Sequence, residues 1–236
     1  MEIKSFEKFI KENIDYGGIW TDDNDLNNED ETTDNLICSA NDIISSNCKF
    51  NSLKNIFKKW TNEDLVSPDC FHIVCGLKGE NEKLFMIDKT KDFNKDVRIE
   101  SVSYILTCII NDTEYVFKIG QSRKNWIERL NSYNCGKKKY RNKGGTNSTT
   151  NYKILQSICN IQKFHPEITF NVYLYGQDNK EEIIWKGINS GMSSPDLRIS
   201  LAVEHILLAL CQKVYNHIPI GNDQVNIKGA TDISRV

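Results

Sequence analysis

The segment that constrains this chain of 236 residues most is 103–129. Two runs in it, 103–110 and 114–120, are rich in β-branched and aromatic side chains and are separated by a short polar stretch. This pattern is typical of two strands joined by a turn. Gly120 ends the second run, and the apolar spacing after it predicts an amphipathic helix. We therefore expect a strand–strand–helix unit at the centre of the fold.

Tyr104 on the first predicted strand and Lys118 on the second are the polar residues of interest in this unit. Because strand side chains alternate between faces, an odd turn such as 110–112, or a β-bulge, would put both on one face. A two-residue turn without a bulge would separate them. An ammonium beside a phenol favours the phenolate, so such a tyrosine can act as a general base. The alternative is an ordinary strand aromatic beside a lysine that extends to solvent.

Two triplets in this segment resemble the motifs of the GIY-YIG nuclease superfamily. Residues 102–104 read Val-Ser-Tyr where the family has Gly-Ile-Tyr, and residues 118–120 read Lys-Ile-Gly where most members begin with Tyr. A lysine there is similar to a branch of type II restriction endonucleases in the superfamily. Arg129 matches the family's helix arginine, and Tyr133 stands where members carry His or Tyr. The resemblance covers roughly residues 102–222.

The resemblance also implies a metal ligand, which in the family is a glutamate on a later helix followed by an asparagine. Glu204 matches this glutamate, and Asn216 lies twelve residues after it, with Asn222 as the alternative. Glu204 would then hold one Mg²⁺ (or Mn²⁺) ion, because a single carboxylate suits one hard cation with water in the rest of its shell. The other possibility for a carboxylate on this apolar helix is a buried Glu–Arg pair.

The implied catalytic residues take separate roles in phosphodiester hydrolysis. Tyr104, helped by Lys118, would take a proton from the attacking water, and Arg129 would neutralise charge on the phosphoryl oxygens. The complete predicted set is Tyr104, Lys118, Gln121, Arg129, Tyr133, Glu204 and Asn216.

Basic residues concentrate just after the motif. Residues 123–143 hold eight Lys or Arg and one acid. Residues 1–100 hold 13 Lys/Arg and 21 Asp/Glu, net −8, whereas residues 101–236 hold 17 and 11, net +6. The motif half thus suits a polyanion, although a solvated charged loop is the alternative. The predicted DNA-contacting residues are Arg123, Lys124, Lys137, Lys138, Lys139, Arg141 and Lys143.

We expect an α+β fold: a small, mainly antiparallel three-stranded sheet flanked by helices, with an N-terminal α/β extension. The predicted catalytic domain is 96–236, and residues 1–95 would serve DNA recognition or dimerisation. The segment 21–35 is too polar to bury and is predicted to be a loop. The helix predicted over 52–60 carries Lys54, Lys58 and Lys59 opposite its apolar stripe, which indicates either a DNA contact or a solvated face.

Together these features predict a Mg²⁺-dependent, site-specific double-stranded DNA endonuclease of the type II restriction class. Such an enzyme implies a homodimer on a palindromic target and a cognate DNA methyltransferase in the same cell. The alternatives are a homing or repair nuclease of the same superfamily and a catalytically inactive DNA-binding module. Scattered cysteines and the absence of a long apolar run or a signal peptide predict a cytoplasmic protein without a membrane span.

Overall fold

The structure is a computed structural model, and it describes residues 37–61, 71–88, 102–122, 126–136, 149–175 and 199–222. Its strands are β1 (Phe71–Glu80), β2 (Lys83–Asp88), β3 (Val102–Ile110), β4 (Thr113–Ser122) and β5 (Thr169–Tyr175). Its helices are α2 (Ala40–Ser46), α3 (Phe50–Thr61), α4 (Trp126–Ser132), the 3₁₀ turn η3 (Tyr133–Gly136), α6 (Thr149–Phe164) and α8 (Ile199–Tyr215). None of the described helices has the length and apolarity that a membrane span requires.

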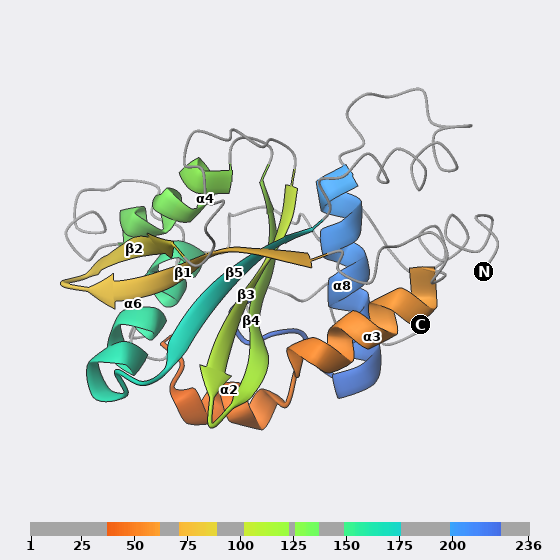
Figure 1. Cartoon of the computed structure of the whole chain (residues 1–236), viewed down its shortest axis with the longest axis horizontal. Helices are drawn as coiled ribbons and strands as arrows, with labels where there is room; N and C mark the ends of the chain where they lie inside the picture. The colour runs from red at the N-terminus through yellow and green to blue at the C-terminus, as the bar shows by residue number, and fades with distance from the viewer. Residues whose placement is uncertain are drawn as a thin grey trace, which may run out of the picture.

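The five strands form one antiparallel sheet in the order β2-β1-β5-β3-β4 (Figure 1). The α+β class is confirmed. The expected three strands are β5, β3 and β4, and the sheet is larger than expected because β1 pairs with β5 and carries β2. The sheet therefore takes strands from both sides of the predicted domain boundary, and the boundary itself lies in residues 89–101, outside the described part.

A β-bulge between β3 and β4 decides which side chains share a face. The strands are joined by the two-residue turn Asn111–Asp112, whose φ angles of 48° and 59° suit a tight hairpin. A two-residue turn alone would have separated Tyr104 from Lys118. The register shifts once, however, so that Leu106 pairs with Lys118 and Tyr104 pairs with Gly120. The bulge thus returns Tyr104 and Lys118 to the same face.

Each face of the sheet has its own apolar core. On the face that carries Tyr104, the core includes side chains from α2, α4, η3 and α6. On the other face, Ile105 and Ile119 pack with side chains of α3 and α8. Figure 1 shows α3 crossing α8 beside the β4 edge. The site described next is built on the Tyr104 face, and the charge of Glu204 acts on it from α8.

Backbone contacts close part of the β4 edge. The amide of Val116 donates to the carbonyl oxygen of Cys48 at 2.7 Å, just before α3. Further along β4, the amide of Gly221 donates to the carbonyl oxygen of Phe117 at 2.8 Å. An edge strand otherwise presents unpaired backbone groups. Both contacts also fix the segments next to α3 and after α8 against the strand that carries Lys118.

Candidate active site

The side chain of Tyr104 lies over the backbone of the neighbouring strand. Tyr104 pairs with Gly120, and a Cβ built on Gly120 would stand 2.4 Å from the Tyr104 hydroxyl oxygen. Real Cβ atoms do not approach other atoms so closely, so a glycine is required at this position. The ring is almost completely buried. The sequence indicated Gly120 only as the end of a strand. In the structure, its lack of a side chain leaves the space that the Tyr104 ring occupies.

Two residues, one from α4 and one from η3, contact the Tyr104 hydroxyl. The Tyr133 hydroxyl lies 2.6 Å from it, and Arg129 Nε donates to it at 3.3 Å. The Arg129 guanidinium carbon also lies 5.5 Å from the centre of the Tyr133 ring, a favourable cation–π distance. The three predicted site residues Tyr104, Arg129 and Tyr133 are thus brought into direct contact. The cation at the phenol is Arg129, whereas we had expected Lys118.

Lys118 is buried on the same face of the sheet, with only 4% of its surface exposed. Its Nζ donates to the carbonyl oxygen of Gly221 at 3.4 Å. Burial lowers the pKa of Lys118 to about 8, with Glu204 opposing this shift and Arg129 and Lys153 adding to it. A lysine with such a pKa exists partly as the free amine near neutral pH, so it can exchange a proton there.

Glu204 comes to this group of residues from α8. Its neighbours Val203, Ile206 and Leu207 are buried against the sheet, which puts Glu204 at the margin of the apolar stripe. Burial raises the pKa of Glu204 to about 7, and the charges of Lys118 and Arg129 oppose that rise. Those two cations act on Glu204 from β4 and α4, so one carboxylate and two cations share this part of the fold.

Burial sets the resting protonation of the two tyrosines. It raises the pKa of Tyr104, against the opposing charge of Arg129 and the hydrogen bond of Tyr133. The pKa of Tyr133 is likewise raised well above its ordinary value by burial. Both phenols are therefore protonated at neutral pH. Tyr104 and Glu204 in turn raise the pKa of Arg129, which stays charged.

Asn222, the alternative to Asn216 as the predicted supporting asparagine, bonds to the backbone of β4. The amide of Ile119 donates to Asn222 Oδ1 at 2.7 Å, and Asn222 Nδ2 donates to the carbonyl oxygen of Ile119 at 2.7 Å. Asn222 is buried and holds β4 between Lys118 and Gly120. Asn216 is exposed at the end of α8, with a left-handed φ of 62°, which is a common way for a helix to end.

Of the remaining predicted residues, the structure describes only Gln121. Gln121 is paired with Ser103, and strand alternation directs its side chain to the opposite face from Tyr104. Its catalytic role stays a prediction. The predicted DNA contacts Arg123, Lys124, Lys137, Lys138, Lys139, Arg141 and Lys143 lie outside the described residues, as does the segment 21–35.

Lys153 on α6 is a residue that sequence reasoning missed. It is buried, and its charge helps to lower the pKa of Lys118. The next residue, Ile154, packs close to Gly221. A Cβ built on Gly221 would stand 3.0 Å from Ile154 Cδ1 and 3.0 Å from Lys118 Cβ. The only sequence signal was a lysine beside the apolar stripe of a helix, and that pattern usually belongs to a solvated face.

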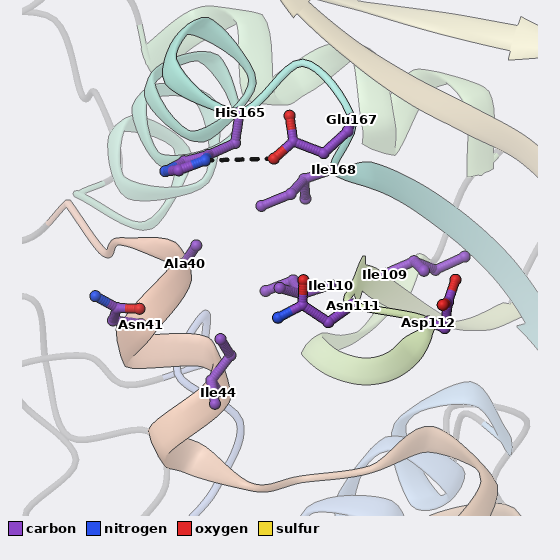
Figure 2. Close-up of a pocket in the computed structure, with 10 residues that line it drawn as sticks. All are labelled: Ala40, Asn41, Ile44, Ile109, Ile110, Asn111, Asp112, His165, Glu167 and Ile168. Atoms are coloured by element: carbon purple, nitrogen blue, oxygen red, sulfur yellow. Dashed lines mark ion pairs between the residues drawn. The ribbon is translucent and has the colours of Figure 1, made fainter.

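A cavity of about 360 Å³ lies at the opposite end of β3 from Tyr104, and Figure 2 shows its lining. Its floor is formed by Ile44, Ile109, Ile110 and Ile168. Its rim includes a contact of 3.4 Å between His165 and Glu167. None of the predicted site residues that the structure describes lines this cavity, so it is separate from the cluster of Tyr104, Arg129 and Tyr133.

Glu204 is also the residue to test for fit to a metal ion. Among the described residues, no three His, Cys, Asp or Glu side chains gather as a metal cage would require. Mg²⁺, however, is commonly held by one or two carboxylates, with water and substrate phosphate as its other ligands. The carboxylate of Glu204 is a hard oxygen donor, and as the deprotonated group it fits such an ion.

Comparison with known proteins gives one similar solved structure. No protein-family model matches the chain, and no curated protein matches it. The restriction endonuclease HPY188I in complex with product DNA is similar to this chain, with 26% sequence identity and a TM-score of 0.44. The match covers 83% of this chain and 97% of that chain.

Proposed function

We propose that this chain is a divalent-metal-dependent endonuclease that hydrolyses double-stranded DNA at specific sites, as type II restriction enzymes do. The observation that carries the proposal is the direct contact of Tyr104 with Tyr133 and Arg129, together with the charges of Lys118 and Glu204, which act on each other's pKa. These residues come from two strands, two α-helices and the 3₁₀ turn η3. A structural core has little need of so many buried polar groups, because each costs free energy to bury.

The resemblance of the two triplets to the GIY-YIG motifs supports the same proposal. The phenol of Tyr104, the lysine of the second triplet and the helix arginine occupy the matching places in the chain. The geometry adds that Arg129 donates to the very oxygen that the resemblance assigns to the base. This agreement concerns three residues separated by up to 25 positions in the sequence.

The residues divide the chemistry as follows. The Tyr104 oxygen accepts a proton from the water that attacks phosphorus, as the bond from phosphorus to the leaving sugar oxygen breaks. Because Tyr104 is protonated at rest, it must first lose its own proton, and Arg129 stabilises the phenolate. The free-amine fraction of Lys118, whose pKa is about 8, is the group that would take that proton. Tyr133 keeps the Tyr104 oxygen in place at 2.6 Å.

Glu204 is the residue that would hold Mg²⁺ or Mn²⁺. When bound, such an ion supplies positive charge to the scissile phosphate and to the leaving oxygen. Arg129 adds a second positive group close to Tyr104, suited to the phosphoryl oxygens. The proposal assigns one metal-binding carboxylate to each chain, and one such site cuts one strand.

Cleavage of both strands therefore requires two chains, so we propose a homodimer on a palindromic target. The host cell needs protection from such an enzyme, and a cognate DNA methyltransferase and a cytoplasmic location are part of the proposal. The assignment of residues 1–95 to recognition or dimerisation and of residues 96–236 to catalysis also belongs to it.

Plasmid digestion tests the proposed function directly. Purified protein is incubated with circular and linearised plasmid in Mg²⁺, in Mn²⁺ and in EDTA, and the ends of any fragments are mapped by sequencing. Discrete fragments with the metal ions, and none in EDTA, are the expected result. Smeared or fork-directed nicking would favour a repair or homing nuclease instead.

The variant Glu204→Ala separates catalysis from binding. It should abolish cutting in Mg²⁺ while DNA binding, measured by fluorescence anisotropy, changes by less than about threefold. A wild-type protein that retards DNA but does not cut it in either metal would indicate an inactive DNA-binding module. Full cutting by Glu204→Ala would remove the metal-binding role from this residue.

A further inference from the structure

Helix α3 has one buried face and one polar, basic face. Its buried side chains are Phe50, Leu53 and Phe57. The side chains of Asn51, Asn55 and Lys59 are exposed, and those of Ser52 and Lys54 are partly exposed. No aspartate or glutamate occurs in the helix, although it belongs to the half of the chain with a net charge of −8. The exposed face thus differs in charge from its surroundings in the sequence.

Two exposed lysines beside α3 extend the same charge. Lys49 precedes the helix and is exposed, and Lys213 is exposed on α8, which packs against α3. Helix α8 contains a single acidic residue, Glu204, and this residue belongs to the candidate active site. The outer surface formed by α3 and the end of α8 is therefore basic, which suits the phosphates of a nucleic acid.

Aromatic packing holds α3 rigidly on the sheet. The Phe50 ring lies 4.4 Å from the Tyr173 ring, and the Phe57 ring lies 5.5 Å from the Tyr175 ring, centre to centre. The ammonium of Lys54 lies 4.9 Å from the centre of the Phe50 ring, which restrains its side chain. Outward side chains on such a helix keep a defined spacing, and direct reading of base edges depends on that spacing.

The position of α3 relative to Glu204 suits a single bound duplex. The thiols of Cys48, just before α3, and Cys211 on α8 are 3.4 Å apart. With a rise of ~1.5 Å per residue, Cys211 lies about 10 Å along α8 from Glu204. The major groove of B-DNA is about 12 Å wide and admits one helix. A duplex that lies on α3 can therefore bring a phosphate of its backbone towards Glu204.

We propose that α3 enters the major groove of the DNA substrate, where Asn51 and Asn55 contact base edges and Lys54 and Lys59 contact phosphates. The two asparagines are four residues apart, so they lie on one side of the helix. An asparagine amide can form two hydrogen bonds with adenine, whereas lysine contacts to phosphate carry no sequence information. This inference rests on the proposed function. It names α3 as the surface that recognises the base sequence of the DNA to be cut.

The lysines are tested by the salt dependence of binding. Affinity for a duplex that wild type selects from a randomised DNA library is measured by anisotropy in Ca²⁺ over a range of salt concentrations, for wild type, Lys54→Met and Lys59→Met. Each variant should bind several-fold more weakly, and the slope of log affinity against log salt should become shallower by about 1. The matched control is Lys163→Met, an exposed lysine at the end of α6, which should leave the slope unchanged.

The asparagines are tested by base preference. A duplex library with a randomised centre is selected with wild type, Asn51→Ala and Asn55→Ala, and the bound DNA is sequenced. Each variant should lose roughly 5- to 100-fold discrimination at one or two base pairs, most clearly at an adenine. Circular dichroism is expected to be unchanged, because both side chains are exposed.

The outcomes separate this inference from the proposed function. Unaltered base preference in both asparagine variants, together with an unaltered salt slope in both lysine variants, overturns the role of α3 even if wild type cuts DNA. If wild type cuts nothing but the α3 variants change binding as stated, the nuclease function fails and the role of α3 stands. Equal losses in the Lys163→Met control would also overturn it, because the effect would then not be local to α3.

Discussion

The ring of Tyr104 lies across Gly120 of the adjacent strand, so closely that an added Cβ would stand 2.4 Å from both Cζ and the hydroxyl oxygen of the tyrosine. The hydroxyl of the same ring contacts Tyr133 and Arg129. Gly120 thus decides where the phenol is held. The strand pairing of these two residues depends on the bulge in β4.

The variant Gly120→Ala should displace the Tyr104 ring and break its contact with Tyr133. We expect single-turnover cleavage to fall by at least about 100-fold, because a shift of 1 Å in a reacting group can cost that much. The free energy of unfolding should fall by about 1–3 kcal/mol, as overpacking in a core does. Both are measured on the same preparation, by plasmid cleavage and by urea unfolding.

Gly79 provides the matched control for this variant. A Cβ there would stand 2.8 Å from the backbone of Cys159, so Gly79→Ala also overpacks the structure, but between β1 and α6. It should lower stability by a comparable amount while the folded protein keeps its cleavage rate. Equal loss of cleavage in the two variants would mean that Gly120 acts through stability alone.

The hydroxyl pair of Tyr104 and Tyr133 should act as one unit. Tyr104→Phe removes the proposed base and should lower cleavage by roughly 10²–10⁴-fold. Tyr133→Phe should lower it less, because Arg129 still contacts the Tyr104 oxygen. In the double variant the two losses should be clearly less than additive on the free-energy scale. Strictly additive losses would show that the hydroxyl contact has no part in the reaction.

The two asparagines at the end of the described chain should behave differently. Asn222→Ala leaves the buried amide and carbonyl of Ile119 without these partners, so we expect a loss of about 2–4 kcal/mol in the free energy of unfolding. Asn216→Gly should change it by less than about 1 kcal/mol, because Asn216 is exposed with a positive φ. Urea unfolding of both variants measures this, and the reverse order would return the supporting role to Asn216.

His205 should make stability depend on pH. Burial lowers its pKa from 6.5 to about 4, so the unfolded chain binds this proton more tightly than the folded protein does. The stabilisation is complete above pH 6.5 and is lost as the pH falls towards 4, by about 3 kcal/mol in total. The raised pKa of Glu204 acts in the opposite direction between pH 4.5 and about 7.

The comparison that isolates His205 is therefore wild type against His205→Leu, with both proteins unfolded by urea at a series of pH values. The difference between their free energies of unfolding should change by about 3 kcal/mol across the stated window. Parallel curves for the two proteins would show that His205 binds its proton equally in the folded and unfolded states.

Much of the fold follows from local patterns in the sequence. The β-branched and aromatic runs in 103–110 and 114–120 predicted β3 and β4 to within about two residues. Those patterns suffice because periodicity depends on residues near one another in the chain. They do not state which strands pair, so the addition of β1 and β2 to the sheet came only from the structure.

The sequence by itself determined the types of residue available for chemistry: a phenol and a lysine on adjacent strands, an arginine on the next helix and one glutamate on a later helix. Only the tertiary structure decided that Arg129 donates a hydrogen bond to Tyr104 and that Asn222 bonds to the backbone of Ile119. These contacts join residues 25 and 103 positions apart in the chain. The reason is physical, because one bulge changes the face of every later side chain in a strand and leaves no mark in composition.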